Sequence, residues 1–195
     1  MKNIAVIYAG KYGTTEKYAR WIAEETGAEV IPESSVSAKD LADRDVIIFG
    51  GAIHTGGIMG IQTLKKLYPQ IAEKKILTFA VGLNVGDKEV QDQCRELNFT
   101  KQPSGFKMLV SGGRRGRMTA QEEAFSQLPC WFFPGAYDPS KVSGVDRKVI
   151  KLVRRMIEGK RAEEITASER QLLEAIDRGA DYTDRAAIRP LIEAI

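Results

Sequence analysis

Short runs of consecutive apolar residues alternate along the chain with longer segments in which apolar residues recur every three or four positions. A continuous apolar run suits a β-strand buried on both faces, and the wider spacing suits a helix with one buried side. Their alternation, with short connections, predicts an α/β fold with a doubly wound parallel sheet. The expected strands are residues 3–8, 29–31, 45–50, 75–81 and 130–133, and the expected helices between them are residues 14–26, 59–71 and 87–97.

The second half of the chain departs from this alternation. Residues 100–129 contain four glycines, a short apolar piece and a basic cluster, which we interpret as an insertion. Residues 145–157 have the spacing of an amphipathic helix, whose apolar side we expect to dock on the sheet. We therefore predict one domain over residues 1–160 and a C-terminal helical extension over residues 161–195 that packs on it. The apolar positions of the amphipathic helix are Val145, Val149, Leu152, Val153 and Met156, and the extension contains two short helices, residues 167–178 and 184–194.

Charge is spread unevenly, although the net charge is only +3. Residues 101–161 hold 13 Lys and Arg against 5 Asp and Glu, a local excess of +8. Such an excess favours an anionic ligand, an acidic partner or an anionic membrane surface, although a solvated helix face is the commoner explanation. Cys94 and Cys130 have no metal-ligand spacing, and His54 is the only histidine. With no signal-peptide pattern at the N-terminus, these features predict a reduced cytoplasmic protein without a zinc site.

The first expected strand runs directly into a glycine-containing turn and then into a helix. Backbone N–H groups at the helix start, together with the hydroxyls of the turn, would converge on an anion there. The turn is not a Walker loop, because its lysine precedes the second glycine, and it is not a G-x-G-x-x-G loop. An ordinary capped helix start explains the same residues at least as well. The candidate anion-binding residues are Gly10, Lys11, Tyr12, Gly13, Thr14 and Thr15.

Two more glycine-containing loops follow the third and fourth expected strands. Ligands of open parallel sheets bind at the carboxyl ends of the strands, so the three loops are expected to meet at one edge. The first loop would hold a phosphate, and the other two would form walls for a flat ring that glycine lets the backbone approach. Alternatively, both are merely tight turns. The candidate ring-contacting residues are Gly51, Ala52, Ile53, His54, Thr55 and Gly56 in the second loop and Gly82, Leu83, Asn84 and Gly86 in the third.

These loops carry a resemblance to a known family. The segment IAVIYAGKYGTTEKYARWIA is similar to the opening of flavodoxin-like proteins, with Gly13, Thr14 and Thr15 on their Gly-x-Thr phosphate turn, and DVIIFGGAIHTGGIMG and FAVGLNVGD resemble their two ring-contacting segments. The segment PGAYDPSKVSGVDRKVIKLVRRMI resembles the branch that contains menaquinone-dependent protoporphyrinogen oxidase and related bacterial flavodoxin-domain proteins. The resemblance implies non-covalent binding of FMN by a five-stranded sheet of order 2-1-3-4-5, for which flavodoxin is the type example.

Three features depart from that family. Where many members carry Ser or Thr in the phosphate turn, this chain has the sequence AGKY, so Lys11 would supply charge in place of hydroxyl donors. The second and third loops contain no aromatic residue to stack on a flavin ring. Flavodoxin shuttles are usually acidic, whereas the sequence pI is near 8.8, which disfavours docking on a basic reductase by charge complementarity.

The interpretation with most support is an FMN-binding redox protein that transfers electrons or hydride equivalents. One alternative is a protoporphyrinogen oxidase-like enzyme that uses a quinone or another acceptor, and a second is a flavin-binding module without catalysis. A domain that binds another nucleotide is a more distant alternative. For the enzyme, His54 is the candidate catalytic residue at the flavin edge. Arg114, Arg115 and Arg117 are candidates for a substrate clamp, although a solvated basic loop is the commoner explanation.

The expected partners follow from these interpretations. They are a redox partner protein, a quinone or a small-molecule substrate, and no nucleic acid. The basic face of the helix over residues 145–157 would also allow peripheral contact with an anionic membrane, although a solvent face on a docked helix is the simpler interpretation. That face consists of Arg147, Lys148, Lys151, Arg154 and Arg155.

Overall fold

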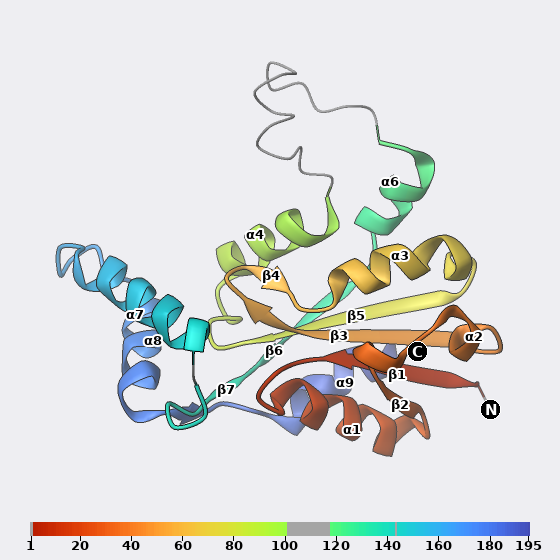
Figure 1. The fold of residues 1–195 in the computed structure, drawn as a ribbon, viewed down its shortest axis with the longest axis horizontal. Helices are drawn as coiled ribbons and strands as arrows, with labels where there is room; N and C mark the ends of the chain where they lie inside the picture. The colour runs from red at the N-terminus through yellow and green to blue at the C-terminus, as the bar shows by residue number, and fades with distance from the viewer. Residues whose placement is uncertain (1, 101–117, 143) are drawn as a thin grey trace.

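A central parallel sheet dominates the computed structural model, which describes residues 2–100, 118–142 and 144–195 (Figure 1). Five strands pair in parallel in the order β2-β1-β3-β5-β6. Numbered along the chain without the short antiparallel strands, this order is 2-1-3-4-5, so the predicted doubly wound α/β fold is confirmed. The strands are β1 (Ile4–Ala9), β2 (Glu29–Pro32), β3 (Val46–His54), β5 (Lys75–Gly82) and β6 (Cys130–Pro134).

Two apolar layers cover the sheet, one on each face. Successive residues of a strand point to opposite faces, so Ala5 and Ile7 of β1 pack in one layer and Val6 packs in the other. Helices α3, α4 and α6 lie over the first face, and α1 lies over the second (Figure 1). The helices are α1 (Thr14–Thr26), α2 (Ala38–Leu41), α3 (Ile61–Ile71), α4 (Lys88–Phe99) and α6 (Ala120–Ser126), with a 3-10 turn η1 (Glu33–Ser35) before α2.

Strand β3 is longer than the sequence pattern predicts. It continues through two glycines to His54 and turns back through Thr55 into the antiparallel strand β4 (Gly57–Ile58). Both glycines lie at strand positions where close packing leaves no room for a side chain: a Cβ on Gly50 would lie 2.0 Å from Cζ of Phe79. The predicted second loop is therefore mostly a β-hairpin.

The C-terminal part forms an arm and then returns to the sheet. Helices α7 and α8 pack on each other and project from the carboxyl edge of the sheet (Figure 1). The chain then runs back along α1, where Ile188 and Leu191 are buried in the core. The predicted helix over residues 167–178 is confirmed, whereas residues 184–194 form a 3-10 turn followed by a short helix. The elements are β7 (Ala136–Tyr137), α7 (Gly144–Glu158), α8 (Ala167–Arg178), β8 (Ala180–Asp181), η2 (Arg185–Ile188) and α9 (Arg189–Glu193).

Helix α7 does not dock as its sequence predicts. Val149 and Val153 are half-buried, but Leu152 and Met156 are 58% and 66% exposed. The helix begins beyond the end of β6 and packs on α8, so its apolar positions do not all reach the sheet. The expectation that the apolar side of this helix docks on the sheet is therefore wrong for Val145, Leu152 and Met156.

Residues 100–129, the predicted insertion, are described only in part. Their helix α6 places Phe125 in the core. Residues 101–117, which include the candidate clamp Arg114, Arg115 and Arg117, lie outside the described residues. Across the three described ranges, no helix combines the length and apolar content needed to cross a membrane. The boundary between the domain and its extension stays a prediction.

Candidate functional site

A cavity of about 580 Å³ lies at the carboxyl edge of the sheet, between the strand ends and the α7–α8 arm. The loops after β1, β3 and β5 contribute to its lining, as expected for ligand sites in open parallel sheets. Its volume falls within the range of cofactor and small-molecule sites, about 300–1,000 Å³. The arm adds an apolar wall, which consists of Val149, Ile150, Val153, Leu172 and Ile176.

The first loop ends at the uncapped N-terminus of α1. Among the described residues no side chain caps this helix, and its first backbone hydrogen bond runs from the N–H of Lys17 to the carbonyl of Gly13, at 2.9 Å. The N–H groups of the first turn therefore have no acceptor within the helix. Thr15 is 1% exposed, and its hydroxyl has no hydrogen-bond partner in the described part of the chain. Because an unsatisfied buried hydroxyl costs about 1–3 kcal/mol, this helix start is suited to an incoming anion.

Two glycines shape this loop. A Cβ on Gly10 would lie 2.7 Å from the hydroxyl oxygen of Thr15, so a larger residue would displace that hydroxyl. Gly13 has a φ of 87°, a left-handed conformation that L side chains rarely adopt. Gly10 thus leaves room for the Thr15 hydroxyl, Gly13 allows the backbone to turn, and neither glycine lines the cavity.

One carboxylate connects the first two loops to the arm. Asp146, in the first turn of α7, accepts hydrogen bonds from Lys11 Nζ at 2.6 Å and from the Tyr12 hydroxyl, and its other oxygen lies 3.2 Å from His54 Nε2. The hydrogen bonds from Lys11 and Tyr12 lower the pKa of Asp146 to about 2, and the hydrogen bond to Asp146 raises the pKa of Lys11. Asp146 is therefore ionised at neutral pH and fastens α7 beside the cavity.

Asp146 is not among the residues that the sequence predicts for the site. An acidic residue in the first turn of a helix is common, because it interacts favourably with the helix dipole, so nothing in the sequence marks it as a site residue. Its partners are 92 to 135 positions away in the chain. Only the folded arrangement reveals the cluster.

The second loop approaches the cavity from the β3–β4 hairpin. Ala52 and Ile53 line the cavity at the end of β3, and His54 and Thr55 line it at the turn. Gly51 does not, since it is buried inside the strand, where a Cβ would lie 2.3 Å from Cγ2 of Ile58. Gly51 therefore packs against Ile58 and Met59 and does not line the cavity.

The third loop contributes a second buried polar atom without a partner. The carboxamide oxygen of Asn84 is buried and accepts no hydrogen bond from the described residues. Next to it, the carbonyl of Gly82 accepts a hydrogen bond from the N–H of Gly135 at 2.9 Å, which holds the loop to the end of β6. Asn84 lines the cavity, where an N–H group of a ligand would satisfy this oxygen.

The cysteines do not contribute to this site. Burial raises the pKa of both Cys94 and Cys130 to about 11, so both thiols are protonated at neutral pH, and neither lines the cavity. No cluster of His, Cys, Asp or Glu that would hold a metal ion occurs within the described ranges. The groups at the cavity are the helix N-terminus, the cluster around Asp146, the Asn84 oxygen and the apolar walls.

A family model described as a flavodoxin domain matches residues 5–164. The chain belongs to the flavodoxin-domain family. Among solved structures, it is similar to oxidised Flavodoxin 1 from Bacillus cereus, with 20% identity over 82% of this chain and 99% of that chain and a TM-score of 0.39. It is also similar to a flavodoxin from the domain Archaea, with 12% identity over 90% and 97% and a TM-score of 0.40. No curated protein matches the chain.

Within this flavodoxin domain, the structure brings together most of the residues that the sequence predicts for the site. Four predicted glycines, Gly10, Gly13, Gly51 and Gly86, do not line the cavity. Tyr137 of β7 also lines the cavity, although the sequence does not predict it for the site, because it lies after the last strand and outside the three loops. The predicted residues on the cavity are Lys11, Tyr12, Thr14, Thr15, Ala52, Ile53, His54, Thr55, Gly56, Gly82, Leu83 and Asn84.

Proposed function

We propose that this flavodoxin domain binds FMN without a covalent link and transfers electrons or hydride equivalents through it. FMN is the cofactor that membership of the family supports, and when bound it supplies the redox chemistry. The observation that carries the proposal is the buried, unpartnered hydroxyl of Thr15 at the uncapped start of α1, beside the cavity. A phosphate would satisfy this hydroxyl and the N–H groups of the first helical turn together.

Thr14, Thr15 and Lys11 would hold the phosphate of FMN. The hydroxyls and backbone N–H groups donate hydrogen bonds, and Lys11 adds the positive charge. Lys11 Nζ is hydrogen-bonded to Asp146, so the phosphate and this carboxylate would share one cation. Lys11 would thereby supply attraction for the phosphate in a loop that has no Ser or Thr hydroxyl before Thr14.

The flat ring would lie between the second and third loops. Ala52 and Ile53 offer an apolar surface on one side, and Leu83 offers one on the other. The flavin ring carries an N–H donor, which the buried oxygen of Asn84 would accept. His54, held by Asp146, would give or take a proton at the ring edge. A redox partner protein or a small molecule would supply or remove the electrons.

Comparison of FMN with riboflavin tests the phosphate contacts directly. We expect a fluorescence titration of the apoprotein to give a dissociation constant for FMN at least about tenfold below that for riboflavin, because only FMN reaches the helix start. Reduction of the bound flavin by dithionite and its reoxidation by an added acceptor would then show redox competence. Equal affinities would contradict the phosphate site, and no binding of either compound would contradict the flavin proposal.

The apolar wall favours a second, more specific function. The wall of the cavity on the side of the arm is apolar and would suit an apolar substrate beside the flavin. It includes Val149 and Ile150 of α7 and Leu172 of α8. We propose that this substrate is oxidised as in protoporphyrinogen oxidase, with a quinone or another compound as the final electron acceptor. Lys and Arg side chains would then bind the substrate's carboxylates.

The basic loop provides the test of this second function. We expect replacement of Arg114, Arg115 and Arg117 by alanine to raise KM for a porphyrinogen while the protein still binds FMN. An unchanged KM would contradict the clamp. No turnover with any porphyrinogen and quinone would contradict the enzyme and leave the electron carrier or a non-catalytic flavin-binding module.

A further inference from the structure

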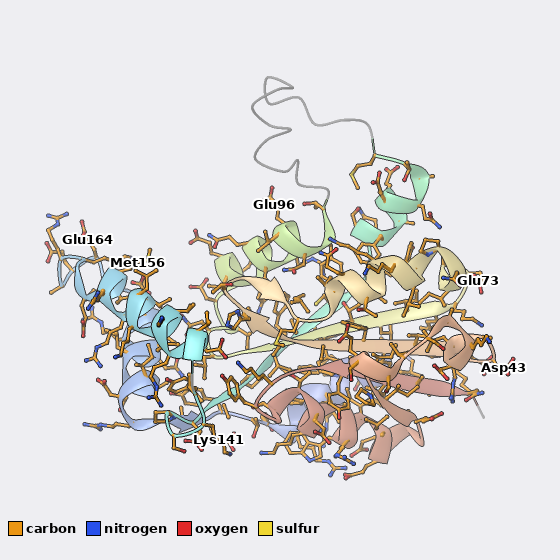
Figure 2. All side chains as sticks on the ribbon, viewed as in Figure 1. Asp43, Glu73, Glu96, Lys141, Met156 and Glu164 are labelled. Atoms are coloured by element: carbon orange, nitrogen blue, oxygen red, sulfur yellow. The ribbon has the colours of Figure 1, made fainter. Side chains whose placement is uncertain are left out.

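Helix α7 exposes a ridge of apolar side chains to solvent. Val145, Leu152 and Met156 are 71%, 58% and 66% exposed, and we call these three residues the α7 ridge. At about 100° per residue, positions 145, 152 and 156 lie within about 40° of one another around the helix. Figure 2 shows Met156 on the projecting arm, at the opposite end of the molecule from Asp43. The three side chains therefore lie along one stripe of the helix, on the arm that projects from the sheet.

Unpaired cations border this ridge. Lys148, Lys151 and Arg155 are exposed and form no ion pair with any described residue. The two acidic residues of α7 are both engaged, Asp146 with Lys11 and Glu158 with Arg154. The outer face of α7 thus combines apolar side chains with positive charge that nothing in the described structure neutralises.

We propose that the α7 ridge and its bordering cations dock the protein reversibly on an anionic lipid membrane. Apolar residues on one face of a helix, with Lys and Arg beside them, are typical of helices that lie in the headgroup region of such membranes. Long basic side chains reach the lipid phosphates while the apolar side chains insert between the acyl chains. The contact is peripheral and depends on both components.

Two other occupants fit the surface less well. A second copy of this chain would bring Lys148, Lys151 and Arg155 against the same cations, and like charges across an interface oppose association. A protein partner with a stable interface needs about 800 Å² on each side, whereas the ridge is three side chains on a convex helix. A fluid lipid surface has no such requirement for matching shape.

Membrane docking would also place the cavity close to the lipid. Val149 and Val153 line the cavity, and at about 100° per residue Val149 lies only about 20° from Met156 around α7, so the ridge is next to the cavity lining. The membrane surface would then lie within about one helix diameter, about 10 Å, of that lining. This location suits exchange of an apolar ligand between the membrane and the cavity, but docking itself does not require a bound flavin.

Vesicle sedimentation tests the proposal. We expect the protein to bind vesicles of phosphatidylcholine mixed with phosphatidylserine, to bind less at high salt, and not to bind phosphatidylcholine alone. Replacement of Leu152 and Met156 by serine should weaken binding at least about tenfold. Replacement of Lys148, Lys151 and Arg155 by glutamine should weaken it about a hundredfold, since each cation near an anionic membrane contributes a factor of about five.

Matched controls change the same residue types elsewhere. Leu97→Ser removes an apolar side chain that is 45% exposed on α4, and Lys39→Gln removes a cation on α2, at the far end of the molecule from α7 (Figure 1). Both should bind vesicles as the wild type does. Circular dichroism and thermal unfolding would show that all variants fold.

Three results would overturn the proposal. The first is no binding to phosphatidylserine vesicles at low salt. The second is binding that the ridge and cation variants leave unchanged. The third is a dimer in gel filtration that the serine substitutions at Leu152 and Met156 convert to a monomer, which would assign the ridge to a second copy of the chain.

Discussion

At the scale of single residues, buried polar atoms without partners define the candidate site. Thr15 and Asn84 each bury an oxygen that no described group satisfies, whereas Asp146 is fully engaged by neighbouring loops. The sequence indicates Thr15, because its position after a strand and a glycine turn is informative. It does not indicate Asp146, because the partners of Asp146 meet it only through the fold.

Thr15→Val tests the role of the unpartnered hydroxyl. We expect FMN affinity to fall about 10- to 100-fold, since a hydrogen bond to a charged group contributes about 1.5–3 kcal/mol. Thermal stability of the apoprotein should stay the same or rise, because valine removes an unsatisfied buried group. Flavin fluorescence titration and thermal unfolding measure the two effects.

Thr78→Val is the matched control. Thr78 is equally buried, but its hydroxyl donates a hydrogen bond to the carbonyl of Pro129 at 2.6 Å. This variant should lose about 1 kcal/mol of stability and keep its FMN affinity. Equal effects of the two substitutions on FMN binding would contradict the phosphate role of Thr15.

Asp146→Asn tests the carboxylate that fastens the arm. The pKa of Asp146 is about 2 in the folded protein against an ordinary value of 3.8, so its charge stabilises the fold at neutral pH. This stabilisation is lost as the pH falls from about 5 towards 2. The wild type should be more stable than the variant in urea at pH 7, and the difference should shrink at pH 3. A difference that does not depend on pH would contradict this role.

At the scale of elements, the sequence predicts well where side chains alternate regularly. The bounds of α1 agree with the prediction at both ends, because its apolar stripe ends at Gly27, a left-handed C-terminal cap. The prediction fails where contacts between residues far apart in the sequence determine the ends or the burial of an element. Gly50 looks like the end of a strand, but β3 continues through it, and glycine is needed there because Phe79 leaves no room for a Cβ. The apolar spacing of α7 predicts burial, but the helix lies beyond the sheet.

The glycines that begin α1 and α3 allow a test at this scale. Gly13 and Gly60 both have positive φ values, 87° and 73°. A Cβ on Gly13 would meet nothing, whereas one on Gly60 would lie 2.7 Å from Cβ of Ala9. Gly13→Ala should cost about 1 kcal/mol from backbone strain alone, and Gly60→Ala about 2–4 kcal/mol because packing strain adds to it. Equal costs in urea unfolding would contradict the close packing at Gly60.

At the scale of the whole molecule, the C-terminal segment both leaves the sheet and returns to it. The arm of α7 and α8 lies beside the cavity, while η2 and α9 complete the apolar layer around α1. The sequence predicts two short helices in this segment, and the structure shows Thr166 capping the first of them. It cannot predict which helix faces meet the sheet, because that depends on where the chain turns back.

Two leucines distinguish the returning segment from the arm. Leu191 of α9 is fully buried, and Leu152 of α7 is 58% exposed. Leu191→Ala should therefore lower the free energy of unfolding by about 2–5 kcal/mol, and Leu152→Ala should change it by less than about 0.5 kcal/mol. Urea unfolding of both variants measures the contrast. A small effect at Leu191 would show that the returning segment is not part of the core.

The central claim is that the cavity between the three loops and the arm holds FMN. The most direct measurement is the visible absorption spectrum of the purified protein after incubation with FMN and removal of unbound flavin by desalting. We expect a flavin band at about one FMN per chain, and no band for Ala52→Trp, which would fill the lining beside the second loop. A colourless wild-type protein, or a band that Ala52→Trp leaves unchanged, would contradict the assignment of the cavity to the cofactor.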